Sequence, residues 1–258
     1  MNHPLVIAHR GNSSSAPENT LTAIREAIDL GTDCVEVDVR CTKDCVPILI
    51  HDPAVGRLTG DSGTVSDLTF EEIMSLHVEK DGRRGERIPT FEEALLEVKE
   101  KTRLVAEMKV DCTDQVLDLV RKHKIDHGLC FAGFRIEMLQ KIYRAMPSFD
   151  VAWILTAPQW IDTNSAKAIE TALESEISMV MPPLPAVTHS SVCCAHEVGL
   201  KVWTWECDTP EQFELALAAG VDGIVTNSPG ELMEFLASRG RRGAAAGKTG
   251  GREDGRTG

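Results

Sequence analysis

The sequence predicts a single α/β domain, a (β/α)₈ barrel, and three observations lead to this fold class. Eight short β-rich runs alternate with amphipathic stretches of helical period. Charged residues stand at the ends of several of these runs, where a parallel barrel carries its functional groups. The length of 258 residues suits one barrel domain.

The predicted strands are Leu5–Ala8, Cys34–Val39, Leu104–Met108, Leu129–Phe134, Val151–Leu155, Met179–Met181, Val202–Trp205 and Gly223–Thr226. Helical stretches include Asn19–Leu30, Phe91–Glu100, Thr113–His123, Pro210–Ala219 and Gly230–Ser238. Because each strand is followed by a helix, neighbouring strands run parallel, and eight such units close into a barrel.

Two helix starts carry capping signals. Thr90 followed by Glu93 forms a capping box, and Asn19 is placed to cap the helix that follows Pro17. We therefore expect helices to begin at these two points.

A further apolar run, Val46–Ile50, follows the second strand too closely for a crossover helix. We interpret residues 35–51 as a hairpin that turns near residues 43–45. With this turn, Asp38 falls roughly opposite His51, and the hairpin delivers His51 to the barrel mouth.

The barrel domain is expected to span residues 1–239. Residues 53–89 form an insertion over the mouth, with a short helix near residues 70–76 and a polar loop at residues 80–87. Residues 240–258 lack periodicity and are expected to form a disordered basic tail.

Charge and composition exclude several function classes. The formal charge is −13, and the last twenty residues contribute +4, so the body carries −17 and does not suit nucleic acid. No signal peptide and no membrane span is visible, so stable membrane insertion is not expected. The eight cysteines mostly lie in apolar runs, which is typical of a reducing cytoplasm.

Three carboxylates at strand ends predict a cation site. Glu36 and Asp38 have i, i+2 spacing, so they share one face of the second strand, and Glu107 ends the third. Oxygen ligands of this kind suit Mg²⁺ or Ca²⁺. Arg10 and Lys109 stand beside these acids, and together with a cation they form a receptor for phosphate.

Two histidines complete the predicted site. His9 ends the first strand, and the hairpin brings His51 to the same mouth. Near neutral pH one imidazole can accept a proton while the other donates one. The combination indicates phosphodiester cleavage.

The same residues belong to a series of motifs that resembles the glycerophosphodiester phosphodiesterase family in order and spacing over about residues 5–237. The matching segments are Ala8-His9-Arg10-Gly11, Pro17-Glu18-Asn19-Thr20, Glu36-Val37-Asp38-Val39-Arg40, Thr42-Lys43-Asp44, His51-Asp52, Arg57-Leu58-Thr59, Ile88-Pro89-Thr90, Glu107-Met108-Lys109, Val202-Trp203-Thr204 and Val221-Asp222-Gly223-Ile224-Val225-Thr226.

The resemblance implies a phospholipase C-like phosphodiesterase barrel with a small insertion after His51-Asp52. It implies one divalent cation, Mg²⁺ or Ca²⁺, on the positions of the three acids. The two histidines are the implied acid and base, and Arg10, Lys109 and Trp203 the implied substrate-binding residues. The implied reaction converts a glycerophosphodiester to glycerol 3-phosphate and an alcohol through a cyclic phosphate, which the glycerol 2-hydroxyl forms and water opens.

This sequence departs from the family pattern at three points. Cys45 stands where a glycine is usual, so the turn must tolerate a side chain. Gly133-Phe134 lacks a usual serine hydroxyl, and Trp205-Glu206 replaces a usual Val-Asn pair. Because of the last two changes, the resemblance does not predict which alcohol is the preferred leaving group of the substrate.

Alternative functions remain at this stage. One is cleavage of a lysophospholipid at an apolar rim that includes Trp160 and Trp205. A catalytically idle barrel that binds phosphorylated metabolites is another, and a structural or interaction protein a third. A zinc site is a further possibility, since His189, Cys193 and His196 share one helix face.

Overall fold

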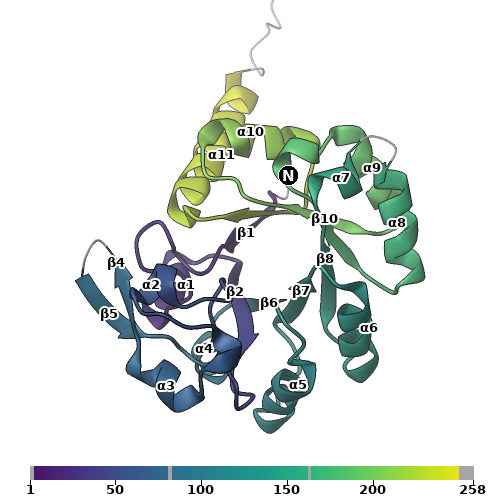
Figure 1. The fold of residues 1–258 in the computed structure, drawn as a ribbon. Helices are drawn as coiled ribbons and strands as arrows, with labels where there is room; N and C mark the ends of the chain where they lie inside the picture. The colour runs from purple at the N-terminus through teal and green to yellow at the C-terminus, as the bar shows by residue number, and fades with distance from the viewer. Residues whose placement is uncertain (1–2, 81–82, 162–163, 250–258) are drawn as a thin grey trace, which may run out of the picture.

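The computed structural model confirms the barrel and describes residues 3–80, 83–161 and 164–249. Its parallel sheet closes because β1 (Leu5–Ala8) pairs with both its neighbours, β2 (Cys34–Cys41) and β11 (Gly223–Thr226). The other parallel strands are β6 (Arg103–Met108), β7 (Leu129–Gly133), β8 (Asp150–Ile154), β9 (Met179–Met181) and β10 (Lys201–Thr204). Figure 1 shows the strands ringed by helices.

The outer layer consists mainly of helices that each follow a strand. These are α1 (Leu21–Leu30), α4 (Phe91–Val98), α5 (Thr113–Lys122), α6 (Ile136–Ala145), α8 (Asn164–Glu174), α9 (His189–Glu197), α10 (Pro210–Ala219) and α11 (Pro229–Thr249). A short helix, α7 (Ala157–Trp160), precedes α8. The predicted capping box at the start of α4 is confirmed.

The period-2 alternation of β2 decides which side chains reach the barrel interior. Val35, Val37 and Val39 join the core between the sheet and the helices, and Cys34 lies in the smaller cluster inside the barrel. Because successive side chains alternate, Glu36 and Asp38 share the inward face with Cys34. Alternate residues of β2 therefore contribute to the hydrophobic core and to the candidate site.

The N-cap of α1 differs from the prediction. Thr20 caps the helix, and its hydroxyl accepts a hydrogen bond from the backbone N–H of Ala23. Asn19 has a φ of 57° and exchanges two hydrogen bonds with Asp38 instead. The prediction of Asn19 as the cap was wrong, because a long-range partner on β2 engages its amide.

The predicted hairpin is present, with a register one residue away from the expected one. In it, β2 pairs antiparallel with β3 (Pro47–Leu49), and Val39 lies opposite Leu49. Asp38 therefore faces Ile50, whose N–H donates to the carbonyl of Asp38. Cys45 takes a φ of 64°, so the turn does hold a side chain where glycine would be unstrained.

The insertion has a small core of its own. It contains α2 (Gly56–Thr59), a 3₁₀ turn at Val65–Asp67 and α3 (Phe70–Ser75). Two antiparallel strands, β4 (His77–Lys80) and β5 (Arg83–Arg87), replace the polar loop predicted there. Their pairing is favoured because Val78 is buried in this core, which packs next to the barrel near α1 and α4 (Figure 1).

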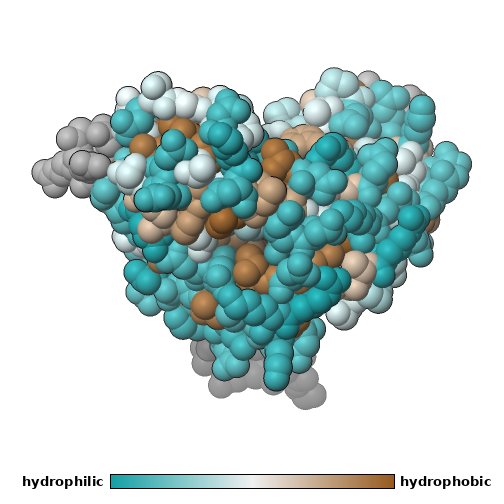
Figure 2. Space-filling model, turned by 60° about the horizontal axis from the view of Figure 1, so that its bottom comes forward, coloured by the Kyte–Doolittle hydropathy of each residue, from teal (hydrophilic) through white to brown (hydrophobic). Residues whose placement is uncertain are grey.

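The last helix and the surface complete the fold. Helix α11 continues ten residues past the predicted domain boundary at 239, to Thr249. No helix in the described ranges is long and apolar enough to cross a membrane. Figure 2 shows small hydrophobic patches separated by hydrophilic side chains on the face turned to the viewer.

Candidate active site

A cavity of about 180 Å³ lies at the carboxyl ends of the parallel strands. The strands bring together residues that are far apart in sequence, as expected for the functional end of a barrel. The cavity is lined by His9, Arg10, Glu36, His51, Glu107, Lys109, Ala132, Phe134, Ile154, Met181, Trp205, Glu206 and Val225.

The three predicted acids meet beside this cavity. Asp38 on β2 pairs in register with Glu107 on β6, and Glu36 lies two residues earlier on the same face of β2. All three are buried, and each offers an oxygen within 4.8 Å of the others. Among the described residues, this is the group with metal-ligand spacing.

Arg10 and Lys109 neutralise part of this negative charge. Arg10 Nε lies 3.0 Å from Asp38 Oδ2, and Lys109 Nζ lies 3.0 Å from Asp38 Oδ1. Lys109 also pairs with Glu107. Gly11, at a φ of 84°, turns the chain after Arg10, and a Cβ there would lie 2.5 Å from the backbone of Ala23.

Burial and neighbouring charges shift the pKa values of the three acids in different directions. Burial, followed by the charges of Asp38 and Glu107, raises the pKa of Glu36 well above its usual range. Burial also raises the pKa of Glu107. Burial acts on Asp38 in the same direction, but Lys109 and Arg10 outweigh it, so the pKa of Asp38 is lowered.

The donor set fits a divalent cation. Glu36 Oε1 and Asp38 Oδ1 are buried oxygens without a hydrogen-bond partner. Lys109 Nζ is an ion-pair neighbour of Asp38 Oδ1, whereas Glu36 Oε1 has no cationic contact among the described residues. A buried acceptor of this kind is costly unless a cation or donor satisfies it.

The imidazole of His9 is held by a hydrogen-bond chain. Its Nδ1 lies 2.8 Å from Asn227 Oδ1. The amide nitrogen of Asn227 donates to Asp208 Oδ2 at 2.7 Å, which leaves the amide oxygen to accept from His9. The proton of neutral His9 therefore sits on Nδ1, and Nε2 presents a lone pair beside the acids.

The electrostatic environment keeps His9 neutral. Burial, followed by the positive charge of Arg10, lowers the pKa of His9. A neutral imidazole with a free Nε2 can accept a proton.

His51 stands in a different environment. It is about one-third exposed, and its Nδ1 lies 2.7 Å from Asp52 Oδ1. Partial burial acts to raise the pKa of Asp52, but hydrogen bonds from Arg57 and His51 lower it to about 2. The ionised carboxylate of Asp52 accepts the hydrogen of His51 Nδ1 and orients the ring, which leaves Nε2 as the nitrogen that can exchange a proton with a substrate.

Arg57 connects the insertion to two loops of the mouth. It forms a two-pronged bond to Glu18, with distances of 2.9 and 2.7 Å, and it also binds Asp52. Glu18 in turn accepts a hydrogen bond from Arg10. Both histidine-bearing segments are therefore tied to the insertion.

Sequence reasoning gave no role to Asp208, Asn227, Glu18 or Arg57. The segments around Glu18 and Arg57 were part of the motif series, which was the available signal. Asp208 and Asn227 follow late strands without a local pattern, so only the fold reveals that they support His9.

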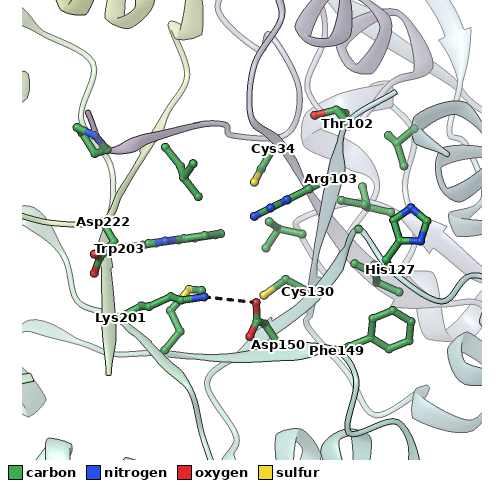
Figure 3. Close-up of a pocket in the computed structure, with 18 of the residues that line it drawn as sticks. Cys34, Thr102, Arg103, His127, Cys130, Phe149, Asp150, Lys201, Trp203 and Asp222 are labelled. Atoms are coloured by element: carbon green, nitrogen blue, oxygen red, sulfur yellow. Dashed lines mark ion pairs between the residues drawn. The ribbon is translucent and has the colours of Figure 1, made fainter. Parts of the chain in front are cut away.

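The structure does not bring Trp203 to this mouth. Trp203 is buried in the barrel interior and lines a separate cavity of about 2090 Å³ at the amino ends of the strands, among Cys34, Cys130 and Asp150 (Figure 3). Trp205, two residues later, lines the cavity near the acids instead.

The zinc alternative gains no support from the described residues. His189 Nε2 lies 3.4 Å from Cys193 Sγ, but His196 Nε2 is bound to Asp222 at 2.9 Å. The three side chains do not form a group with metal-ligand spacing.

Comparison with known proteins identifies the family. The family model of the glycerophosphoryl diester phosphodiesterase family matches residues 9–231. A glycerophosphodiester phosphodiesterase of Caldanaerobacter subterraneus is 30% identical over 246 residues, which cover 92% of this chain and 99% of that protein.

Solved structures share the fold. A Silicibacter pomeroyi protein that carries the family name is 26% identical, with a TM-score of 0.82 over 93% of this chain and 96% of that one. A phosphodiesterase of Oleispira antarctica, solved with sn-glycerol-3-phosphate, is 22% identical with a TM-score of 0.82 over 91% and 97%, which shows a common fold. The chain therefore belongs to the glycerophosphoryl diester phosphodiesterase family and is a phosphoric diester hydrolase.

Proposed function

We propose that this enzyme hydrolyses glycerophosphodiesters to glycerol 3-phosphate and an alcohol with the help of one divalent cation. The observation that carries the proposal is one cavity that holds a carboxylate group suited to a cation, two cationic side chains and two histidines of different environment. Metal-assisted cleavage of a phosphodiester uses a cation, positively charged side chains that bind the phosphate, and one group each to accept and to donate a proton.

Glu36, Asp38 and Glu107 are the proposed cation ligands. Their hard oxygen donors favour Mg²⁺ or Ca²⁺. When bound, the cation would supply positive charge beside the phosphate oxygens and would satisfy the buried oxygen of Glu36.

Arg10 and Lys109 are the proposed phosphate-binding pair. Both line the cavity, and their charged atoms are held beside Asp38. A guanidinium and an ammonium fixed in this way can stabilise the charge that builds up on phosphate oxygens during cleavage.

The two histidines divide the proton transfers. His9 Nε2 would accept the proton of the substrate's glycerol 2-hydroxyl as that oxygen attacks phosphorus. His51 would donate a proton to the leaving alcohol oxygen, which yields a cyclic phosphate. In the second step the roles reverse, and water opens the ring to glycerol 3-phosphate.

The first test is product release. Purified protein is incubated with glycerophosphocholine, and the release of glycerol 3-phosphate is measured by a coupled assay. The assay is run in the presence of EDTA and again after Mg²⁺ or Ca²⁺ is restored. We expect EDTA to abolish release and one of the cations to restore it. Full activity in EDTA would overturn the cation dependence, and no release with any cation from any glycerophosphodiester would overturn the reaction.

The acid–base roles are tested by single substitutions. His9→Ala and His51→Ala should each lower kcat by about 10²–10⁴, because each removes one proton transfer. Exposed His127, at the opposite end of the barrel, supplies His127→Ala as a matched control that should retain kcat. A near-normal kcat for either active-site variant would remove that residue from the mechanism.

Two tryptophans favoured the alternative of a lysophospholipid substrate, and the structure removes one of them from the argument. Trp160 is fully buried beneath the surface and cannot form an apolar rim. Trp205 does line the cavity, but its indole N–H is fixed by the carbonyl of Met181 at 2.8 Å. Lysophosphatidylcholine serves as the comparison substrate, with choline release as the readout, because its cleavage would leave the acyl chain on the glycerol phosphate and release no glycerol 3-phosphate.

The proposed compartment is the cytoplasm. All eight cysteines are free, and Cys34, Cys112, Cys130 and Cys207 are buried. Buried thiols without disulfide partners are typical of proteins that work in a reducing compartment.

A further inference from the structure

Arg57 is a residue of the insertion that contacts two loops of the barrel mouth. It lies on α2, where its neighbours Val55 and Leu58 are buried in the core of the insertion. The side chain of Arg57 itself is about half exposed. The place where its guanidinium stands therefore depends on how the insertion packs.

The guanidinium of Arg57 uses all three nitrogens on two carboxylates. Its Nε donates to Asp52 Oδ2, and the two terminal nitrogens donate to Glu18 at 2.9 and 2.7 Å. An arginine presents its donors in one rigid plane, so the two carboxylates that it binds are held in fixed positions relative to each other.

Asp52 connects this guanidinium to His51. Its Oδ1 accepts the hydrogen of His51 Nδ1 at 2.7 Å, while its Oδ2 accepts from Arg57. With a donor on each oxygen, the carboxylate cannot rotate without losing one of the two hydrogen bonds. Loss of Arg57 would free Oδ2, and the imidazole of His51 would lose its fixed orientation.

Glu18 connects the same guanidinium to Arg10. Its Oε1 accepts hydrogen bonds from both arginines, at 2.9 Å from Arg10 and 2.7 Å from Arg57. Burial acts to raise the pKa of Glu18, but the hydrogen bonds and charges of Arg57 and Arg10 outweigh it, so this pKa is lowered. Two cations thus share one ionised carboxylate. Without Arg57, the full charge of Glu18 would act on Arg10 and draw its guanidinium away from the phosphate.

We propose that Arg57 is a positioning residue that couples Arg10 to His51 and makes turnover depend on the docking of the insertion. The inference rests on the proposed function, because it assigns a support to two residues of that mechanism. The alternative is a surface ion pair that only adds to the stability of the fold, and it predicts no change in turnover per folded molecule.

The first test replaces Arg57 and follows kcat and KM for glycerophosphocholine at saturating cation. Arg57→Ala should lower kcat by about 10²-fold, because His51 loses its orientation, and should also raise KM, because Arg10 is displaced. Arg57→Lys should recover only a small part of the loss, since one ammonium group cannot hold two carboxylates in one plane. Unchanged kcat and KM in Arg57→Ala would overturn the inference and leave the proposed function intact.

Arg25→Ala is the matched control. Arg25 also binds a carboxylate, that of Glu97, through two nitrogens, and its side chain is exposed to a similar degree. This variant should keep the kcat and KM of the wild type.

Chemical rescue separates positioning from stability. Added guanidinium should restore part of kcat to Arg57→Ala by occupying the space of the missing side chain, although guanidinium weakens folded proteins in general. A kcat of Arg57→Ala that falls only in proportion to the folded fraction, without rescue, would show that Arg57 has a structural role alone.

A binding measurement keeps the inference testable if turnover fails. Inorganic phosphate is titrated calorimetrically into wild type, Arg57→Ala and Arg25→Ala at saturating Mg²⁺. Wild type and Arg25→Ala should bind phosphate equally, and Arg57→Ala about tenfold more weakly, because Arg10 is displaced. Equal affinity of all three proteins would overturn the coupling, whereas the expected difference without hydrolysis of any glycerophosphodiester would overturn the proposed reaction alone.

Discussion

Asn227 lies 218 residues away from His9 in the chain, yet its amide decides which imidazole nitrogen faces the cavity. Asp208 makes this possible by engaging both the amide nitrogen and the backbone N–H of Asn227. The support of His9 is thus a property of two late strand ends, β10 and β11.

Removal of the Asn227 amide should affect turnover more than binding. We expect Asn227→Ala to lower kcat by about 10²-fold with little change in KM, because the imidazole loses its fixed orientation. Steady-state kinetics and a thermal melt measure this. Asn12→Ala, which removes a side-chain amide that donates to Glu26 on α1, should retain kcat.

A merely structural role of Asn227 would give a different result. In that case the melting temperature would fall while kcat per folded molecule stayed near that of the wild type.

The acid Glu107 provides a second test at this scale. Glu107→Gln should weaken cation affinity by about 10²-fold or more, because even the loss of an outer partner of a metal ligand costs about 10–100-fold. Isothermal titration with Mg²⁺ and Ca²⁺ measures the affinity. An unfolding midpoint that drops while cation affinity holds would contradict the ligand assignment.

Much of the site could be predicted residue by residue. His9, Arg10, Glu107 and Lys109 stand at the ends of β1 and β6, and Glu36 lies on the inward face of β2. The barrel topology therefore brings them to one mouth. Trp203 could not be placed in this way. The position where β10 ends decides which of the two tryptophans, 203 or 205, reaches the cavity.

At the scale of elements, the alternation of β2 was readable because buried valines occupy every second position. The predicted hairpin register was wrong by one residue. The register depends on the centre of the turn, and sequence spacing places that centre only approximately. The pairing of β4 with β5 was missed because its support is a small core distributed over the whole insertion.

Helix α4 allows a prediction on pH dependence. Arg87 hydrogen-bonds Glu93 and, with the capping contacts of Thr90, lowers the pKa of Glu93 from 4.5 to about 2. A lowered folded-state pKa means that the stabilisation is complete above the unfolded pKa of about 4.5 and is lost as pH falls towards about 2.

The variant Glu93→Gln should therefore melt at a lower temperature than the wild type at pH 7, and the difference should shrink progressively from pH 5 to pH 3. Differential scanning calorimetry at these pH values measures it. Glu170→Gln, at an exposed position of α8, is the matched control. A difference that grows on acidification would show that Glu93 does not stabilise the fold as a carboxylate.

At the scale of the whole molecule, the proposed site is complete within the barrel and its insertion. The side chains that line the cavity all lie at or before Val225, and the support of His9 ends at Asn227. We expect removal of residues 240–258 to leave kcat and KM unchanged. A large loss of kcat in the truncated protein, measured beside the full chain, would show that the basic tail contributes to turnover.

The lining residues of the cavity come from several different strand ends, and this has a consequence for how such an enzyme can diversify. Replacements at Phe134, Trp205 and Glu206 change strand ends that carry neither the acid cluster nor the two histidines. A few substitutions on this half of the barrel can therefore change the shape and charge of the cavity, while the acid cluster and the two histidines stay in place.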